Sequence, residues 1–466
     1  MNGLLNEVPG CHTQLLWPDY VDNAPNIFYG SFNFAAYQYP DERMYEAANV
    51  MNNKISEFVS DKYDMKIMTF NYIDGIYELN RRGGTTMDIP DGYCRIELIN
   101  GNEPADYISE ELFSQKLKYD KMNQSLYRDL IIFNDTYGNK CTLTLKYDNG
   151  ETYEVEVYGG VKGEIASIYA LSNSLSETEE NASSNEQGEE KSNDYLITEN
   201  EFIGDYTYSY LDGNTLYTNH YTFDSGIDEK KAYAEFIKAC DYDNVIIDIR
   251  DNTGGSIITF SDFVYQFYFS ENKTEDIILF GKINNETNMA VNDFEHHTPN
   301  NGIYYEYEKI RYGKSREKIY KININQNYRG NMEDKNIYVL ISGTTASAAD
   351  SAAHFMKENT DAVIIGENTA GEGYSSYVFK TLPDSGLVMS YTPFFPEPIA
   401  ENNEYSIIGT TPDIYSALSI DMYRKKIDMS LKGEKTDLYK NRLKWDNVLI
   451  ETLDIIKENQ KNNPAE

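Results

Sequence analysis

The stretch Gly343–Asp350 reads Gly-Thr-Thr-Ala-Ser-Ala-Ala-Asp and directly follows Ser342 and the apolar run Ile337–Ile341. This pattern predicts a buried strand, a turn of small residues, and a helix with Ser347 in its first turn. A helix N-terminus leaves N–H groups unpaired and carries the positive end of the helix dipole, which favours an oxyanion beside the serine hydroxyl. Two interpretations are open: Ser347 is a nucleophile, or it caps the helix.

The composition restricts the class of protein. A chain of 466 residues predicts two to four domains. The balance of 41 basic against 76 acidic residues gives a net charge of −35, which repels phosphate backbones and argues against nucleic-acid binding. No apolar run approaches the length of about 18 residues that suits a membrane span, and the first residues form no positively charged signal peptide. No Cys-x-x-Cys pair suggests a metal or redox site among the four cysteines, Cys11, Cys94, Cys141 and Cys240.

The first half of the chain changes pattern twice. Residues 1–62 are predicted to form a small helical N-terminal cap, with apolar residues at helical spacing between Asp41 and Phe58. Residues 172–194 contain six Ser and six Glu but no aromatic residue, which predicts a disordered acidic linker. Between these segments, residues 63–158 form a β module of short alternating strands, predicted at 66–72, 93–99, 130–133, 140–147 and 152–157.

Residues 195–439 form the largest predicted unit. Continuous apolar strands alternate with helices there, which favours a largely parallel sheet covered by helices. A polar insertion occupies 272–334, and residues 440–466 are predicted to form a C-terminal amphipathic helix and tail. The strands are predicted at 202–211, 215–223, 244–250, 337–341, 362–366 and 386–391, and helices at 228–240 and 258–269.

Three separated motifs in this unit resemble the core signatures of the S41 peptidases, the C-terminal processing or tail-specific serine proteases. They are Asp-Ile-Arg-Asp-Asn-Thr-Gly-Gly at Asp248–Gly255, Thr-Ala-Ser-Ala-Ala-Asp at Thr345–Asp350, and Gly-Glu-Asn-Thr-Ala-Gly-Glu-Gly at Gly366–Gly373. Thr411–Ile414 resembles the family's late Pro-Asp segment. The resemblance covers most of residues 1–418 and implies an α/β fold with a ClpP/crotonase-like core.

The β module at 63–158 resembles a PDZ domain. Its segment Asp91–Gly101 leads into an Ile-Asn-Gly turn of the PDZ kind, although the carboxylate-binding loop signature is not visible. Such modules bind extended peptides by adding them as a strand. A small β module with only a packing role is the alternative.

The resemblance assigns roles to four residues of the core motifs. Ser347 becomes the nucleophile. The backbone N–H of Ala348, with one from Gly254 or Gly255, would form the oxyanion hole, since a Gly-Gly turn lets the backbone approach a substrate carbonyl.

The general base departs from the processing proteases. The family lysine position is Glu372 here, and a carboxylate near its ordinary pKa is a poor base for an alcohol. A branch similar to tricorn protease uses a Ser-His-Glu arrangement instead, and Gly10–Thr13 matches its His-Thr motif. This implies His12 as the base. Glu404 would orient it, with Glu401 and Glu372 as alternatives.

The other histidines compete with His12 for this role. His220 is the second candidate, because a core strand could direct it toward the site. His354 lies seven residues beyond Ser347 on one predicted helix, roughly 10 Å along the axis, which is too far for a hydrogen bond. His296 and His297 lie in the polar insertion, where solvent exposure is expected.

The resemblance therefore implies a serine endopeptidase that cleaves extended, unfolded or C-terminal peptide segments through an acyl-enzyme. It implies no metal and no organic cofactor. The alternative is a catalytically inactive S41-like protein that binds peptides or other ligands. Family members of this kind are mostly exported or attached to the cell envelope, and the closeness of His12 to Met1 suggests a shortened N-terminus. The sequence does not determine the oligomeric state.

Overall fold

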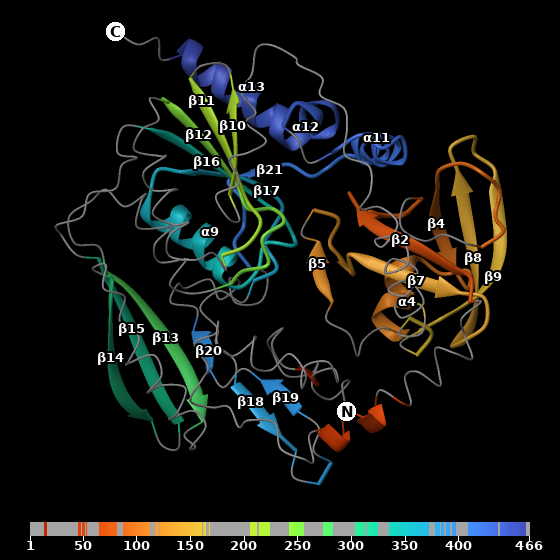
Figure 1. Ribbon diagram of the computed structural model, residues 1–466, viewed down its shortest axis with the longest axis horizontal. Helices are drawn as coiled ribbons and strands as arrows, with labels where there is room; N and C mark the ends of the chain where they lie inside the picture. Colours follow the sequence, from red (N-terminus) through yellow and green to blue (C-terminus); the bar gives the residue numbers. More distant parts are fainter. Residues whose placement is uncertain are drawn as a thin grey trace. The chain divides into compact units, whose positions relative to one another are not determined.

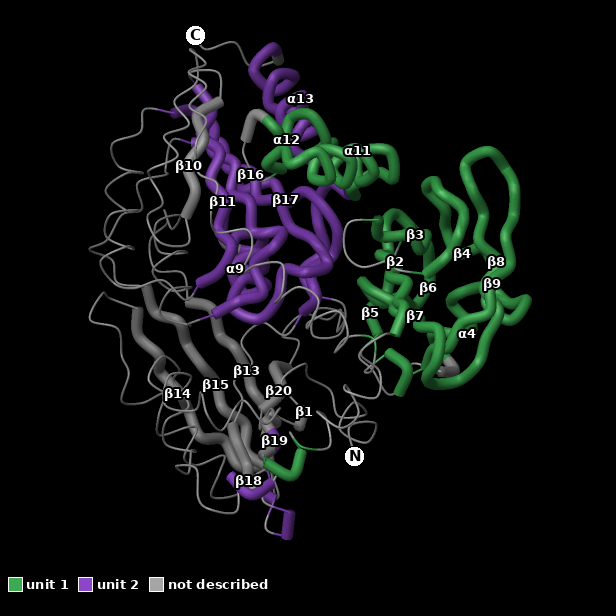
Figure 2. Tube along the Cα trace, turned by 45° about the vertical axis from the view of Figure 1, so that its right-hand side comes forward, with its two compact units in different colours: residues 1–7, 49–194, 417–447 green, residues 8–48, 195–416, 448–466 purple. Residues whose placement is uncertain are grey.

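The computed structural model has two compact units, each assembled from segments that are distant in the sequence (Figure 2). Unit 1 combines Met1–Glu7, Asn49–Asp194 and Ala417–Asn447, and unit 2 combines Val8–Ala48, Tyr195–Ser416 and Val448–Glu466. The structure describes residues 14–15, 45–47, 49–51, 53, 65–81, 87–111, 117–120, 122–160, 162–164, 167, 206–211, 214–223, 242–255, 274–282, 303–312, 315–324, 335–371, 378–382, 384–385, 388–391, 394–397, 409–436 and 439–462.

A closed six-stranded barrel forms the body of unit 1. Alternate residues of β8 are buried, and the same alternation along the sequence predicted the strand. Phe70 and Phe133 meet edge to face inside the barrel, with ring centroids 6.3 Å apart. All five predicted strands are confirmed to within two residues at each end. The barrel order is β2 (Ile67–Ile73), β3 (Ile76–Leu79), β4 (Cys94–Ile99), β8 (Asn139–Tyr147), β9 (Thr152–Gly159) and β7 (Leu130–Asn134).

Smaller elements accompany the barrel in unit 1. They are α4 (Pro104–Glu111) and the pair of strands β5 (Lys118–Asp120) and β6 (Ser125–Tyr127). Two helices from far along the chain, α11 (Ile420–Leu431) and α12 (Tyr439–Trp445), belong to the same unit. The sequence predicts residues 195–439 as one unit, so the assignment of α11 to unit 1 differs from that prediction.

A six-stranded sheet forms the centre of unit 2. Only β10 runs antiparallel to its neighbour; the other five strands are parallel, so the predicted largely parallel sheet is confirmed. All residues of β11 and β12 are buried, as expected for parallel strands enclosed by other layers. The order is β10 (Tyr206–Leu211), β11 (Thr215–His220), β12 (Asn244–Asp248), β16 (Asn336–Ile341), β17 (Val363–Gly366) and β21 (Ile414–Tyr415).

Helix α9 (Ala348–Asn359) follows β16 and packs against β17 (Figure 1). Its inner face is formed by Ala349, Ala352, Phe355 and Met356, all buried. The last helix, α13 (Asn447–Asn462), also reaches this sheet, because the side chain of Asn459 donates a hydrogen bond to the Tyr338 hydroxyl (3.3 Å). This helix lies within residues 440–466, where the sequence predicts a C-terminal amphipathic helix and tail.

Two further sheets belong to unit 2. The stretch 272–334, interpreted only as a polar insertion, contains three strands of a four-stranded antiparallel sheet in the order β14 (Ile303–Tyr312), β15 (Ser315–Ile324), β13 (Thr274–Lys282) and β20 (Phe394–Glu397). A three-stranded sheet joins β1 (Gln14–Leu15), β19 (Val388–Tyr391) and β18 (Val378–Thr381).

Several predictions fall on residues outside those described: the linker 172–194, the helices 228–240 and 258–269, and most of the N-terminal cap. Within the cap, residues 45–47, 49–51 and 53 are helical. Among the described helices, none combines the length and the apolar character needed to cross a bilayer.

Candidate functional site

Ser347 lies between β16 and α9 in a strained backbone conformation. Its φ of 53° and ψ of −123° place a non-glycine residue at positive φ, which costs about 1–3 kcal/mol and occurs often at active sites. The residue occupies the N-cap position, but its side chain makes no capping hydrogen bond. The capping interpretation therefore loses its physical basis, because the hydroxyl does not satisfy a helix N–H group.

The glycine loop after β12 touches the Ser347 turn. A Cβ added at Gly254 would lie 2.7 Å from Ser347 Cβ, 2.9 Å from Ala346 O and 3.0 Å from Ala348 N. No side chain fits in this space, and Gly254 also has a φ of 112°. The sequence motif places glycine here because two stretches of backbone approach each other this closely.

The N–H groups of the two candidate oxyanion glycines have different surroundings. The Gly254 N–H donates to Asn252 Oδ1 (2.8 Å), so this group is already engaged. The Gly254 carbonyl accepts from the N–H of Phe223 (2.9 Å). The peptide bond that follows is trans, so the N–H of Gly255 points away from Phe223. Of the two groups, the Gly254 N–H is thus the one that is bonded to Asn252.

The third motif lies directly against the serine. The Ser347 N–H donates to Gly371 O (3.2 Å), and Ala346 and Gly371 form a parallel β-bridge. The N–H of Ala370 donates to Thr345 O (2.8 Å). Glu372, the position of the family lysine, is the next residue in the chain after Gly371 but lies outside the described residues.

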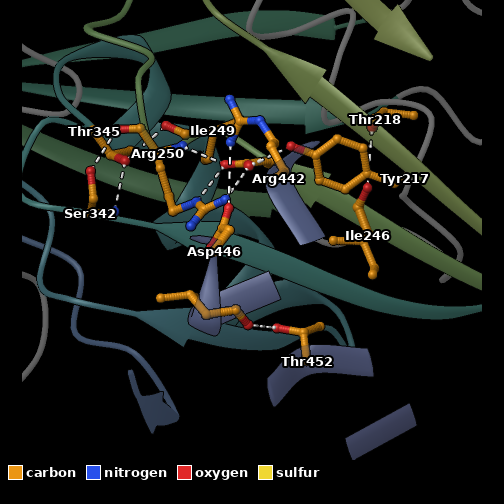
Figure 3. Close-up of polar contacts among 12 residues, drawn as sticks. Tyr217, Thr218, Ile246, Ile249, Arg250, Ser342, Thr345, Arg442, Asp446 and Thr452 are labelled. Atoms are coloured by element: carbon orange, nitrogen blue, oxygen red, sulfur yellow. Dashed lines mark hydrogen bonds and ion pairs between the residues drawn. The ribbon is translucent and has the colours of Figure 1, made fainter. Parts of the chain in front are cut away.

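A hydrogen-bonded network joins the first motif to the serine turn (Figure 3). The Asp248 carboxylate accepts from Arg250 Nε (2.9 Å) and from the Tyr217 hydroxyl (2.7 Å). One residue farther along the same loop, Ile249 O accepts from Thr345 Oγ1 (2.9 Å), and Ser342 Oγ donates to Arg250 O (2.5 Å). These bonds fix the end of β12 against the turn that precedes Ser347.

A buried carboxylate organises the other side of the turn. Asp350 lies in the first turn of α9, where the helix dipole favours a negative charge. Its Oδ1 accepts from Thr369 Oγ1 (2.5 Å), from Thr410 Oγ1 (2.8 Å) and from Thr410 N (3.2 Å). Gly409 is equally constrained, since a Cβ there would lie 2.2 Å from Thr369 Oγ1. Asp350 thus holds the third motif and the late Pro-Asp segment to the helix that starts at Ser347.

The Pro-Asp segment itself connects α9 to the sheet. Asp413 Oδ2 accepts from the Ile364 N–H (2.9 Å), and its Oδ1 forms an ion pair with Lys357 Nζ (2.9 Å). The Lys357 ammonium also donates to Thr411 O (2.7 Å). This aspartate therefore has a structural role at the edge of the core sheet.

The structure describes two of the histidines considered as bases. His220 is fully buried, its Nε2 lies 3.1 Å from Thr218 Oγ1, and burial lowers its pKa to about 3 although the Asp248 carboxylate acts in the opposite direction. A group with so low a pKa is a weak general base at neutral pH. Burial also lowers the pKa of His354. These properties disfavour His220 as the alternative to His12.

His12, Glu401 and Glu404 lie outside the described residues, as do His296 and His297. The strand that begins two residues after His12 is described: Gln14 pairs with Ser390 and Leu15 with Met389. This pairing ties the N-terminal segment to a sheet of unit 2. Among the residues described, no cluster of three or more His, Cys, Asp or Glu side chains could hold a metal ion.

Residues 214–416 match the family model of peptidase family S41. This part of the chain is similar to the S41 peptidases. The match contains all three core motifs and the Pro-Asp segment, and it agrees with the predicted family and with the predicted enzyme class, a serine-type peptidase.

Solved structures similar to this chain include other proteases. Mature CPAF is 13% identical, with 92% of this chain and 95% of that chain covered and a TM-score of 0.42. The photosystem II D1 C-terminal processing protease is 13% identical, with 75% and 72% covered and a TM-score of 0.31. A proposed peptidase from Parabacteroides merdae is 17% identical, with 50% of this chain covered and a TM-score of 0.35; the match spans 62% of that chain.

Two residues of the segment 214–416 gained importance only from the structure. Asn252 and Asp350 both stand within the quoted motifs, but the motifs alone indicate no role for them. An acidic residue in the first helical turn is a recognisable signal for Asp350. Its partners Thr369 and Thr410 are 19 and 60 residues away, and no local pattern reveals such pairs.

Proposed function

We propose that this protein is a serine endopeptidase that cleaves extended or C-terminal peptide segments through an acyl-enzyme on Ser347. The supporting observation is the backbone at Ser347, which is held at positive φ between Gly254 and Gly371 while its hydroxyl makes no capping bond. In this proposal the six-stranded sheet with α9 is a ClpP/crotonase-like core. The barrel of unit 1 is a PDZ-like module that binds the substrate peptide.

The proposed reaction begins with attack of Ser347 Oγ on the scissile carbonyl carbon. The base, His12 in this proposal, takes the hydroxyl proton, and Glu404 accepts the other ring N–H and fixes the tautomer. The oxyanion forms against the N–H groups of Ala348 and Gly255. The first lies in the first turn of α9, where backbone N–H groups have no partner within the helix, and the second is chosen over Gly254 because the Gly254 N–H is bonded to Asn252.

Collapse of the tetrahedral intermediate breaks the C–N bond, and the protonated base gives its proton to the leaving amine. Water then attacks the ester carbonyl with the same base accepting its proton, which releases the carboxylic acid and restores Ser347. Each step transfers one proton through the base, and none requires a metal or an organic cofactor.

Labelling with a fluorophosphonate probe and turnover of an unstructured peptide test this proposal. The parent protein should label at Ser347 and cleave the peptide, and Ser347→Ala should lose both. Ser109→Ala, an exposed serine on α4, is the matched control and should label like the parent. Unchanged cleavage by Ser347→Ala would disprove the assignment of the nucleophile.

The replacement of the family lysine by Glu372 favours a second function, a catalytically inactive peptide-binding protein. The same assay separates the two. Peptide binding by the parent without cleavage or labelling would support the inactive protein. Loss of cleavage in His12→Ala, with peptide binding retained, would support the histidine base.

A further inference from the structure

Asn252 connects the glycine loop to the residue that precedes the nucleophile. Its backbone N–H donates to Ile249 O (3.1 Å), and its carbonyl oxygen accepts from the Ala346 N–H (3.1 Å). Its side chain is completely buried, and Oδ1 accepts from the Gly254 N–H (2.8 Å). One residue thus bonds both to the loop that carries Gly255 and to the turn that carries Ser347.

Hydrogen bonds hold the backbone on both sides of the Gly254 Cα. Asn252 Oδ1 holds the Gly254 N–H, and the Gly254 carbonyl is held by Phe223 N (2.9 Å) and Thr222 Oγ1 (3.3 Å). The two peptide units that meet at the Gly254 Cα are therefore both held, the preceding one through the Gly254 N–H and the following one through the Gly254 C=O. Because a trans peptide directs its N–H opposite to its C=O, the bonds to the Gly254 carbonyl also set the direction of the Gly255 N–H.

The other end of the Asn252 amide is an unused donor. Since the Gly254 N–H can donate only to an oxygen, the remaining atom of the amide is the NH2 group. This Nδ2 is buried and has no hydrogen-bond partner among the described residues. A buried donor without a partner opposes folding, and such groups in native proteins call for an explanation.

We infer that Asn252 is a positioning residue of the oxyanion hole, an inference that rests on the proposed peptidase function. Its Oδ1 holds the Gly254 N–H and its carbonyl oxygen holds the Ala346 N–H, so it keeps the loop that carries the Gly255 N–H against the turn that carries the N–H of Ala348. Its buried Nδ2 carries a positive partial charge, whereas an oxygen atom in its place would repel the negative charge that develops on the substrate. In this inference the buried donor stabilises the transition state, although it destabilises the folded protein.

Asn252→Asp tests this role, because it keeps an acceptor for the Gly254 N–H and exchanges the donor for an anionic oxygen. We expect kcat and the rate of probe labelling to fall about 100-fold at pH 8, the magnitude typical of a lost oxyanion donor, with KM changed less than about threefold. The ratio of variant to parent rates should rise as the pH falls and the new carboxyl group is protonated. Asn459→Asp, at an exposed residue of α13, is the isosteric control and should match the parent.

Thermal unfolding of each variant separates positioning from folding. Asn252→Ala, which removes both amide atoms, gives a second test and should also lower kcat at least tenfold. If the parent protein labels at Ser347 and the Asn252 variants react at the same rate as the parent, the inference is wrong but the peptidase function is unaffected. If the ratio of variant to parent rates does not change with pH and falls with the thermal stability of the variant, the inference is wrong and Asn252 has a structural role. A parent that neither labels nor cleaves disproves the peptidase function and the inference together.

Discussion

The backbone at Ser347 shows how single residues create this site. Positive φ at a serine stores strain, and the surrounding hydrogen bonds from Gly371, Asn252 and Thr345 maintain it. Glycine at 254 makes the arrangement possible, because the loop backbone packs directly against Ser347 Cβ. Close packing at Gly254 therefore helps to hold Ser347 in its strained conformation.

Gly254→Ala should disrupt this packing. The new Cβ would meet backbone atoms of Ala346 and Ala348 at 3.0 Å or less, and alanine at a φ of 112° is itself unfavourable. Backbone atoms cannot move aside as a flexible side chain can. We expect the free energy of unfolding to fall by more than about 2 kcal/mol and probe labelling of Ser347 to be lost. Urea denaturation and labelling rates measure the two effects.

Gly433→Ala provides the control for Gly254→Ala. Gly433 also has positive φ (78°), but a Cβ there would meet nothing within 4 Å. Gly433→Ala should lower the free energy of unfolding by about 1 kcal/mol, the cost of placing a residue with a Cβ at positive φ. Probe labelling of Ser347 should be unchanged. Equal losses of stability in the two variants would show that backbone conformation, and not contact with the serine turn, determines the effect.

The sequence predicted the residues of the serine turn because their signal is local. A strand, small residues and a helix start stand next to each other around Ser347, and the glycine pair at 254 and 255 is visible as a motif. Asn252 and Asp350 could not be assigned in this way. Their roles depend on partners brought close by the fold, such as Ala346 for Asn252 and Thr410 for Asp350.

Helix α11 shows how an element far along the chain completes unit 1. Arg424 Nε donates to Glu78 Oε1 (2.7 Å), and its Nη1 reaches Asp148 (2.8 Å). The hydroxyl of Tyr93 donates to Asp428 Oδ1 (2.5 Å). Glu78 is completely buried in the barrel, and this burial raises the pKa of its carboxyl group against the opposing effect of Arg424. The ion pair thus connects α11 to a charge that has no solvent contact.

Arg424→Met should therefore be strongly destabilising. The substitution leaves the Glu78 carboxylate buried without its cation, and removal of one partner of a buried pair costs about 3–5 kcal/mol. Adding Glu78→Gln to this variant should recover part of the loss, since no buried charge remains. Chemical denaturation of the two single variants and the double variant gives the coupling energy.

Lys425→Met controls for the loss of a positive charge on α11. Lys425 is exposed and adjacent to Arg424, so its substitution should change the unfolding free energy by less than about 0.5 kcal/mol. An effect of Arg424→Met no larger than that of Lys425→Met would contradict a role for the buried pair.

Strands and helices were more predictable than their grouping. The alternation along β8 and the continuous apolar runs of β12 and β16 identify these strands from the sequence, since side-chain burial follows the backbone period. The attachment of α11 to the barrel depends on Glu78, 346 residues away from Arg424. The stretch 272–334 was interpreted as polar, although β13, β14 and β15 form long antiparallel pairs there.

At the scale of the whole molecule, the chain passes between the two units more than once. The barrel precedes most of unit 2 in the sequence, and α11 and α12 of unit 1 follow it (Figure 2). Unit 2 likewise receives β1 from the N-terminal segment, paired with β19. Each unit therefore contains chain from both sides of residues 172–194. A sequence interpretation that assigns domains as consecutive ranges cannot anticipate this exchange.

This exchange predicts that a cut between residues 172 and 194 leaves the two fragments bound to each other. The N-terminal fragment carries the barrel and β1, and the C-terminal fragment carries α11 and β19. The Glu78–Arg424 and Tyr93–Asp428 contacts and the β1–β19 pairing all cross the cut. A protease site engineered into this segment, followed by size-exclusion chromatography of the cleaved protein, tests the prediction. The fragments should elute together in native buffer and separate only in denaturant. Separate elution in native buffer would show that these contacts do not hold the exchanged segments in place, because every covalent connection between the fragments has then been removed.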